Sequence, residues 1–224
     1  MKKLVVVQSG LSVPSSTKVI AEQIAGSVKA QVSKRGEGLD VEFVDVKDYL
    51  NDLASFMSTG IPGRKLNSVQ EKISSADALV AATPVFTASY SGVFKLFFDS
   101  FGTDSLNGMP MIIAATAGTP RHSLVLDYAM RPLFTYLRAV VMPTGIFAAT
   151  DDFGSEEGVA SRISRAASEL SEYIVSTEKG SVVGFGPDFL SNDGIEKGKR
   201  RNPGTRVEMG SSFADLLKGH DGNL

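Results

Sequence analysis

Five short apolar runs alternate with helical patterns through the first 176 residues, and this alternation restricts the possible folds more than any other feature of the sequence. Each run has the length of one strand. Apolar residues at helical spacing follow, as Val19, Ile20 and Ile24 do after the first run. A βαβαβαβαβα order predicts a parallel sheet with helices on both faces. The predicted strands span 4–7, 40–46, 78–83, 109–116 and 140–150.

Right-handed crossovers leave few arrangements of five such strands. We therefore predict a flavodoxin-like three-layer α/β sandwich whose five-stranded parallel sheet has the order 2-1-3-4-5. In such a fold, ligands bind beyond the carboxyl ends of the strands, where the strand order reverses between strands 1 and 3. Three loops should meet there: Ser9–Thr17, Pro84–Ser91 and Thr116–Ser123.

Two prolines and one long connection carry further expectations. Pro84 should end the third strand, since proline cannot donate a backbone hydrogen bond. Pro132 should bend or widen the helical segment 123–139 for the same reason. Residues 47–65 contain two glycines and a proline and are expected to be irregular.

Composition favours a small-molecule partner. The absence of cysteine excludes disulfides, thiolate metal sites and a cysteine nucleophile. With 23 basic and 25 acidic residues the net charge is -2, so the chain lacks the basic footprint of a duplex-DNA binder. The apolar run near the N-terminus, Leu4–Val7, is too short for a signal peptide or a membrane span, and we expect a cytoplasmic protein.

The first loop is rich in hydroxyls and opens the first long helix. Helix N-termini present unpaired N–H groups and a partial positive charge, which suits a phosphate monoester. The alternative is that Ser15 or Ser16 simply caps the helix. Neither a Walker A sequence nor a G-x-G-x-x-G follows the first strand, which weakens the ATPase and Rossmann interpretations. Asp45 ends the second strand and is expected to be a turn residue rather than a ribose ligand.

The other two loops offer surfaces for a flat ligand. Pro84, Val85, Phe86 and Thr87 combine apolar surface with polar groups, although Phe86 is equally consistent with an ordinary core or interface aromatic. The small residues of 116–119 let backbone N–H groups approach a ligand edge, unless the segment is a plain turn. A phosphate end, a planar body and a hydrogen-bonded edge together describe an FMN-shaped site.

At these residues the sequence resembles the NAD(P)H-dependent FMN reductase family, most closely the flavin reductases that supply two-component monooxygenases such as the alkanesulfonate system. The matching stretches are "SGLSVPSST", "ATPVFTASYSGVFKLFFD" and "ATAGTPRHSLVLDYAMRPLFTYLRAVVMPTGIFA". The resemblance implies hydride transfer from NADPH or NADH to FMN. Many relatives have an arginine in the first loop, where this chain has Leu11 and Ser12, so its phosphate would rest on neutral donors.

The family's site residues carry over by position. The resemblance implies phosphate contacts at Ser9, Ser15, Ser16 and Thr17, ring contacts at Pro84, Val85, Phe86 and Thr87, and flavin-edge contacts at Thr116, Ala117, Gly118 and Thr119.

Flavin reduction needs no protein acid or base, so we expect no catalytic side chain and no metal. Arg121 and His122 follow the third loop and are candidates for the 2′-phosphate of NADPH, unless they are a solvated pair at a helix start.

The helix of residues 123–139 is apolar over more surface than one sheet face covers, which predicts a homodimer or homotetramer. In the monooxygenase-partner reductases, a tyrosine at the position of Tyr128 accompanies a widened turn at the subunit interface. Residues 1–176 should form the flavodoxin-like domain, and 177–224 an extension that is mobile or docked on a neighbouring subunit. The alternatives are an FMN-containing quinone or azo reductase, a flavodoxin-type electron carrier, or a phosphate-binding module without turnover.

Overall fold

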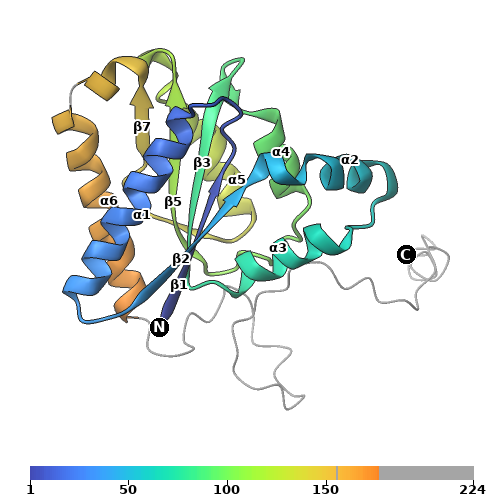
Figure 1. Cartoon of the computed structure of the whole chain (residues 1–224), viewed down its shortest axis with the longest axis horizontal. Coiled ribbons are helices and arrows are strands. Elements are labelled where there is room, and N and C mark those ends of the chain that lie inside the picture. The colour runs from blue at the N-terminus through green and yellow to red at the C-terminus, as the bar shows by residue number, and fades with distance from the viewer. Residues whose placement is uncertain (155, 177–224) are drawn as a thin grey trace, which may run out of the picture.

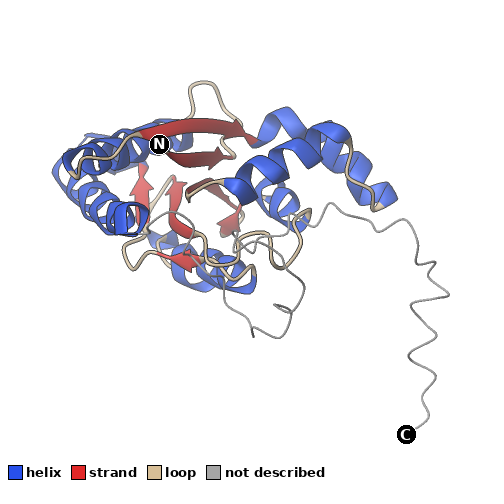
Figure 2. Cartoon of the chain, turned by 90° about the horizontal axis from the view of Figure 1, so that it is seen from below, coloured by secondary structure: helices blue, strands red, loops and turns tan. Residues whose placement is uncertain are grey.

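The computed structural model describes residues 1–154 and 156–176, and the extension 177–224 lies outside the described residues. Its parallel sheet has the order β2-β1-β3-β5-β6, with β7 also pairing with β5. Helices cover both faces of the sheet (Figures 1 and 2). The predicted flavodoxin-like α/β sandwich is therefore confirmed. The strands are β1 (Lys2–Gln8), β2 (Leu39–Asp45), β3 (Ala78–Phe86), β4 (Ser89–Tyr90), β5 (Pro110–Ala117), β6 (Val140–Val141) and β7 (Ile146–Ala149).

The fifth predicted strand forms as two short pieces. β6 pairs with the start of β5 and β7 with its end, and Met142–Gly145 connects the two. Pro143 lies in this connection and has no N–H to give to a ladder, which accounts for the interruption.

Alternating side chains of the central strands supply two separate cores. Leu4 and Val6 of β1 face α1 (Ser16–Lys34) and α6 (Glu156–Ser176), whereas Val5 and Val7 face the opposite layer. That layer contains α2 (Leu50–Thr59), α3 (Arg64–Ser75), α4 (Gly92–Asp99) and α5 (Arg131–Tyr136). Burial on both faces explains why these strands have no polar alternation.

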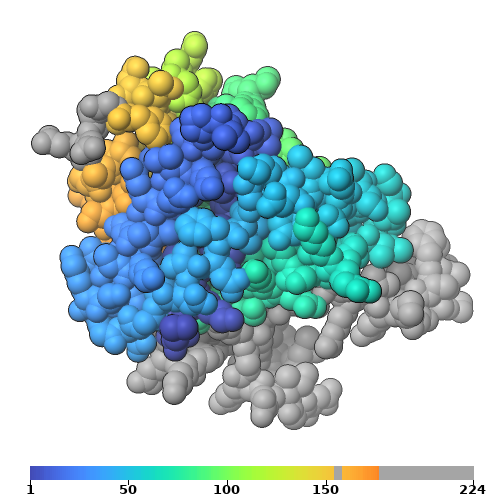
Figure 3. Space-filling view, viewed as in Figure 1, coloured from blue at the N-terminus to red at the C-terminus, as the bar shows by residue number. Residues whose placement is uncertain are grey.

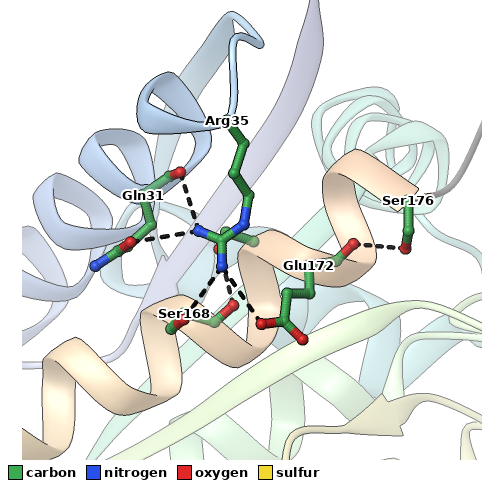
Figure 4. Close-up of polar contacts among 6 residues, drawn as sticks. Gln31, Arg35, Ser168, Glu172 and Ser176 are labelled. Carbon is green, nitrogen blue, oxygen red and sulfur yellow. Dashed lines mark hydrogen bonds and ion pairs between the residues drawn. The ribbon is translucent and has the colours of Figure 1, made fainter.

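The layer of α1 and α6 is fastened at one end by Arg35 (Figure 4). Its guanidinium donates to the backbone oxygen and side chain of Gln31 in α1, and across to Ser168 at 3.2 Å and Glu172 at 3.4 Å in α6. The two helices therefore hold a fixed relation to each other, which matters because both begin at the carboxyl edge of the sheet (Figure 1).

The expectation of an irregular segment at 47–65 is wrong. A 3₁₀ turn (Val46–Tyr49) leads directly into α2, and helix geometry persists to Thr59. Leu53 is fully buried and Phe56 packs against the same core, so tertiary packing outweighs the turn-forming residues. Gly60 ends the helix with a left-handed φ of 70°.

Pro84 does not end the third strand, contrary to expectation. β1 pairs with β3 only as far as Ala82, so Pro84 lies where one side of β3 has no parallel neighbour. The strand then continues to Phe86 and turns back into β4 through Thr87 and Ala88.

The widened turn expected near Pro132 is present. A π-helix spans Leu126–Met130, and the N–H of Arg131 donates to the carbonyl of Leu126, five residues earlier. Asp127 and Arg131 form an ion pair at 3.2 Å, and Arg131 also donates to the carbonyls of Met142 and Pro143. The π-helix is thereby tied to the β6–β7 connection.

Candidate functional site

Ser9 follows β1 directly and braces two of the three loops. Its amide donates to the carbonyl of Ala82 at 3.1 Å, and its buried hydroxyl lies 3.2 Å from that of Ser91. The Ser91 hydroxyl caps α4 by accepting from the N–H of Phe94, and the Ser91 amide donates to Thr83. The structure therefore holds the start of the first loop against the end of the second.

Beyond Ser9 the chain offers a row of backbone donors at the start of α1. The amides of residues 11–13 and 15–17 have no hydrogen-bond acceptor among residues 1–154 and 156–176. Ser15 caps the helix by accepting from the N–H of Lys18 at 3.2 Å, as the simpler interpretation expected. The donors of the first turn remain available beside this cap, which is the arrangement that binds a phosphate at a helix N-terminus.

Gly10 makes this turn possible. A Cβ at Gly10 would lie 2.0 Å from the Ser15 hydroxyl oxygen and 3.0 Å from the side-chain oxygen of Gln8. Gln8 is buried, and its side chain accepts from the N–H of Gly10 at 2.8 Å. Neither residue was among the predicted site residues; their signal in the sequence is a polar side chain at the end of an apolar strand, followed by Ser-Gly.

Thr17 and Thr116 join the first loop to the third. Their buried hydroxyls lie 2.7 Å apart although the residues are separated by 99 positions. Thr116 is also the register partner of Pro84 across β3 and β5, so all three predicted loops meet at one edge of the sheet.

The second loop is a tight hairpin. Val85 pairs with Tyr90 and Phe86 with Ser89, which leaves only Thr87 and Ala88 in the turn. Both have positive φ, at 49° and 67°. Such turns favour glycine and asparagine, so this backbone stores strain of order 1–3 kcal/mol per residue beside the candidate site. Phe86 is 46% exposed, so it is not a core aromatic, and the alternative of an interface aromatic stays open.

The charged residues near the three loops lie at the surface or at turns. Arg121 is exposed and donates to the Thr119 hydroxyl at 3.1 Å, while His122 is half-buried in the adjoining 3₁₀ turn (Pro120–His122). Asp45 caps the 3₁₀ turn by accepting from the backbone N–H of Lys47, as expected of a turn residue, and its other carboxylate oxygen lies 3.0 Å from the Lys47 ammonium, a side-chain hydrogen bond that raises the pKa of the lysine. Lys18 lies 3.9 Å from Glu22 on the exposed face of α1.

The fold and the three loops define a flavodoxin-like α/β protein with free backbone donors at the start of α1. The family model for NADPH-dependent FMN reductase matches residues 2–154, and the chain belongs to this family. The family predicted from the resemblance is confirmed.

Relatives of this chain include "FMN reductase (NADPH)" from Pseudomonas aeruginosa, 33% identical over 74% of this chain and 88% of that protein. "NADH-dependent FMN reductase SfnF" from Pseudomonas putida is 31% identical over 77% of this chain and 92% of that protein. Among solved structures, an oxidoreductase from Corynebacterium diphtheriae is 54% identical with a TM-score of 0.77, over 80% of this chain and 99% of that one.

Proposed function

We propose that this protein is an NAD(P)H:FMN oxidoreductase that passes hydride from a nicotinamide nucleotide to FMN. The observation that carries the proposal is the row of free amides at the start of α1, shaped by Gly10 and joined to the second and third loops by buried hydroxyl pairs. These donors suit a phosphate, and the adjoining loops suit a flat ring.

The FMN site is proposed to use the residues predicted from the sequence. The amides of Ser15, Ser16 and Thr17 and the exposed hydroxyl of Ser16 would contact the phosphate, and Ser9 acts by holding the loop against α4. The hairpin of Pro84, Val85, Phe86 and Thr87 forms one wall for the ring. The backbone of Thr116, Ala117, Gly118 and Thr119 lines the ring's hydrogen-bonding edge.

When bound, FMN supplies the ring that accepts hydride. The chain's own task is to position the two reactants and to exclude competing reactions. The pairing of β3 with β4 keeps Phe86 and Thr87 in a defined place without help from a ligand, despite the strain of the turn. No proton transfer by a side chain is required, so the proposed mechanism has no catalytic acid or base.

The nicotinamide nucleotide is proposed to pass Arg121 and His122, which stand at the end of the third loop. A relative named for NADPH and another named for NADH match this chain about equally well. The proposed preference between the two nucleotides therefore rests on Arg121 and His122 of this chain. Within the described ranges only Nε of Arg121 has a partner, the Thr119 hydroxyl, which leaves its other two guanidinium nitrogens for a phosphate.

The first test is turnover. Full-length protein with added FMN should oxidise NADPH or NADH, and the rate should fall to background when FMN is withheld from flavin-free protein. A protein that holds FMN but oxidises neither nucleotide would instead be an electron carrier. Oxidation that requires a quinone or azo compound would indicate the related reductase.

Arg121→Ala should raise the KM for NADPH about three- to tenfold with little change in kcat, because one exposed charge-assisted contact is lost. A parallel rise for NADH would place the contact at the pyrophosphate. Arg64→Ala, which removes another exposed arginine on α3, serves as the control. Unchanged Michaelis constants for both nucleotides would remove Arg121 from the site.

An exposed aromatic face on the π-helix and α5 supports self-association of the chain. Tyr128 in the π-helix and Tyr136 in α5 leave 79% and 71% of their surfaces exposed, a face suited to a homodimer or homotetramer. No helix in the described ranges is long and apolar enough to cross a membrane. We propose a cytoplasmic enzyme with the domain boundary near residue 176, which delivers reduced flavin to a partner monooxygenase.

A further inference from the structure

A pocket of about 570 Å³ lies away from the phosphate-binding loop, between the π-helix and the first turns of α6. The β6–β7 connection and β7 form its floor. Its volume is within the range of small-molecule sites. It begins at Ser123, where the third loop ends, so it adjoins the proposed flavin edge along the chain.

Three arginines and one acid line the pocket, which gives it a formal charge of +2 in a chain whose net charge is -2. Arg131 is committed to Asp127 and to two backbone carbonyls. Arg162 and Arg165 make no hydrogen bond or ion pair with any residue in the described part of the chain. Two guanidinium groups one helical turn apart are thus available to an anion.

The remaining lining has a mixed character. Ser123, Thr144 and Ser161 add hydroxyl-bearing residues to the lining. Leu124, Pro143 and Phe147 add apolar wall. Thr144 donates from both its N–H and its hydroxyl to Glu169, whose carboxylate lies outside the lining and keeps its negative charge, so it offsets part of the positive charge of the arginines. An apolar wall beside two neighbouring arginines without partners in the described ranges suits a base attached to phosphate groups.

We infer that this pocket binds the phosphate-bearing adenosine half of the nicotinamide nucleotide, with Arg162 and Arg165 holding phosphate oxygens and the apolar wall receiving the adenine. The inference rests on the proposed use of NAD(P)H. Arg121 directly precedes the pocket in the sequence and remains a candidate contact for a phosphate of the same nucleotide.

The probe is adenosine 2′,5′-bisphosphate, which has the adenosine phosphates but no nicotinamide to stack on a flavin. Calorimetric titration of full-length protein should show binding that weakens at least tenfold in Arg162→Ala/Arg165→Ala, since each lost charge-assisted bond is expected to have an effect of that size. Arg162→Lys/Arg165→Lys should recover part of the affinity, because lysine restores charge without the guanidinium fork. Arg64→Ala should bind as the unchanged protein does.

Steady-state kinetics gives an independent measurement. The double alanine variant should raise the KM for NADPH at least tenfold while leaving FMN affinity and the assembly state unchanged. The inference would be overturned if the bisphosphate did not bind, or if Arg64→Ala weakened its binding as much as the double alanine variant does. It would also be overturned if the bisphosphate displaced a second FMN molecule instead of the nicotinamide nucleotide. Bisphosphate binding that depends on Arg162 and Arg165 in a protein without turnover would uphold the pocket and reject the proposed function instead.

Discussion

Phe98→Ala is expected to lower the free energy of unfolding by about 3–5 kcal/mol, the range for truncating a buried aromatic side chain. Phe98 is 1% exposed, and its ring lies 4.8–5.6 Å from those of Phe94, Phe97, Phe101 and Phe134. These aromatic residues join α4, the segment after it and α5 in one cluster. A methyl group cannot fill the cavity, and the edge-to-face contacts with Phe94 and Phe134 are lost as well.

Urea denaturation followed by circular dichroism measures the effect, since the chain has no tryptophan to serve as a probe. Phe43→Ala is the matched control, because Phe43 lies on the edge strand β2 and is 49% exposed. It should cost less than about 1 kcal/mol. Equal losses for the two variants would mean that the aromatic cluster does not determine the stability of this layer.

The sheet could be predicted from sequence because its central strands are buried on both faces. Val5 and Val80 lie in such runs, and runs of this kind alternating with helices leave few topologies. The prediction of an irregular segment at 47–65 was wrong because it gave glycine and proline more weight than the spacing of Tyr49, Leu53 and Phe56. That spacing places apolar groups on one face of a helix. The prediction that β3 ends at Pro84 was also wrong. A proline is tolerated there because β1 stops pairing before Pro84, and local sequence does not show where that pairing stops.

The candidate site could be predicted as residue types but not as a network. Loop order on the sheet places the loops of Ser9, Thr87 and Thr116 near each other, and that much follows from topology. The pairing of Thr17 with Thr116 depends on side-chain packing between α1 and β5, which no local pattern encodes. Arg162 and Arg165 likewise have the pattern of a solvated helix face until the π-helix is placed opposite them.

Gly10→Ala is expected to raise the Kd for FMN at least tenfold, although it adds only one methyl group. The added Cβ would lie 2.0 Å from the Ser15 hydroxyl oxygen and 3.1 Å from its Cβ, so a rotamer change alone does not relieve the contact. The loop must shift, the cap on Lys18 N–H is lost, and the amides of the first turn no longer converge on one phosphate. Loss of one charge-assisted bond already accounts for about tenfold.

Gly26→Ala separates this effect from a general response to adding a methyl group to the first loop and helix. Gly26 lies in the middle of α1, with nothing within 4 Å of the added Cβ. The control should bind FMN normally and gain about 0.5–1 kcal/mol in stability from helix propensity. Gly10→Ala should instead lose about 1 kcal/mol with the cap. If fluorescence titration gives both variants the same FMN affinity, the phosphate does not rest on the turn that Gly10 shapes, because only that turn distinguishes the two substitutions.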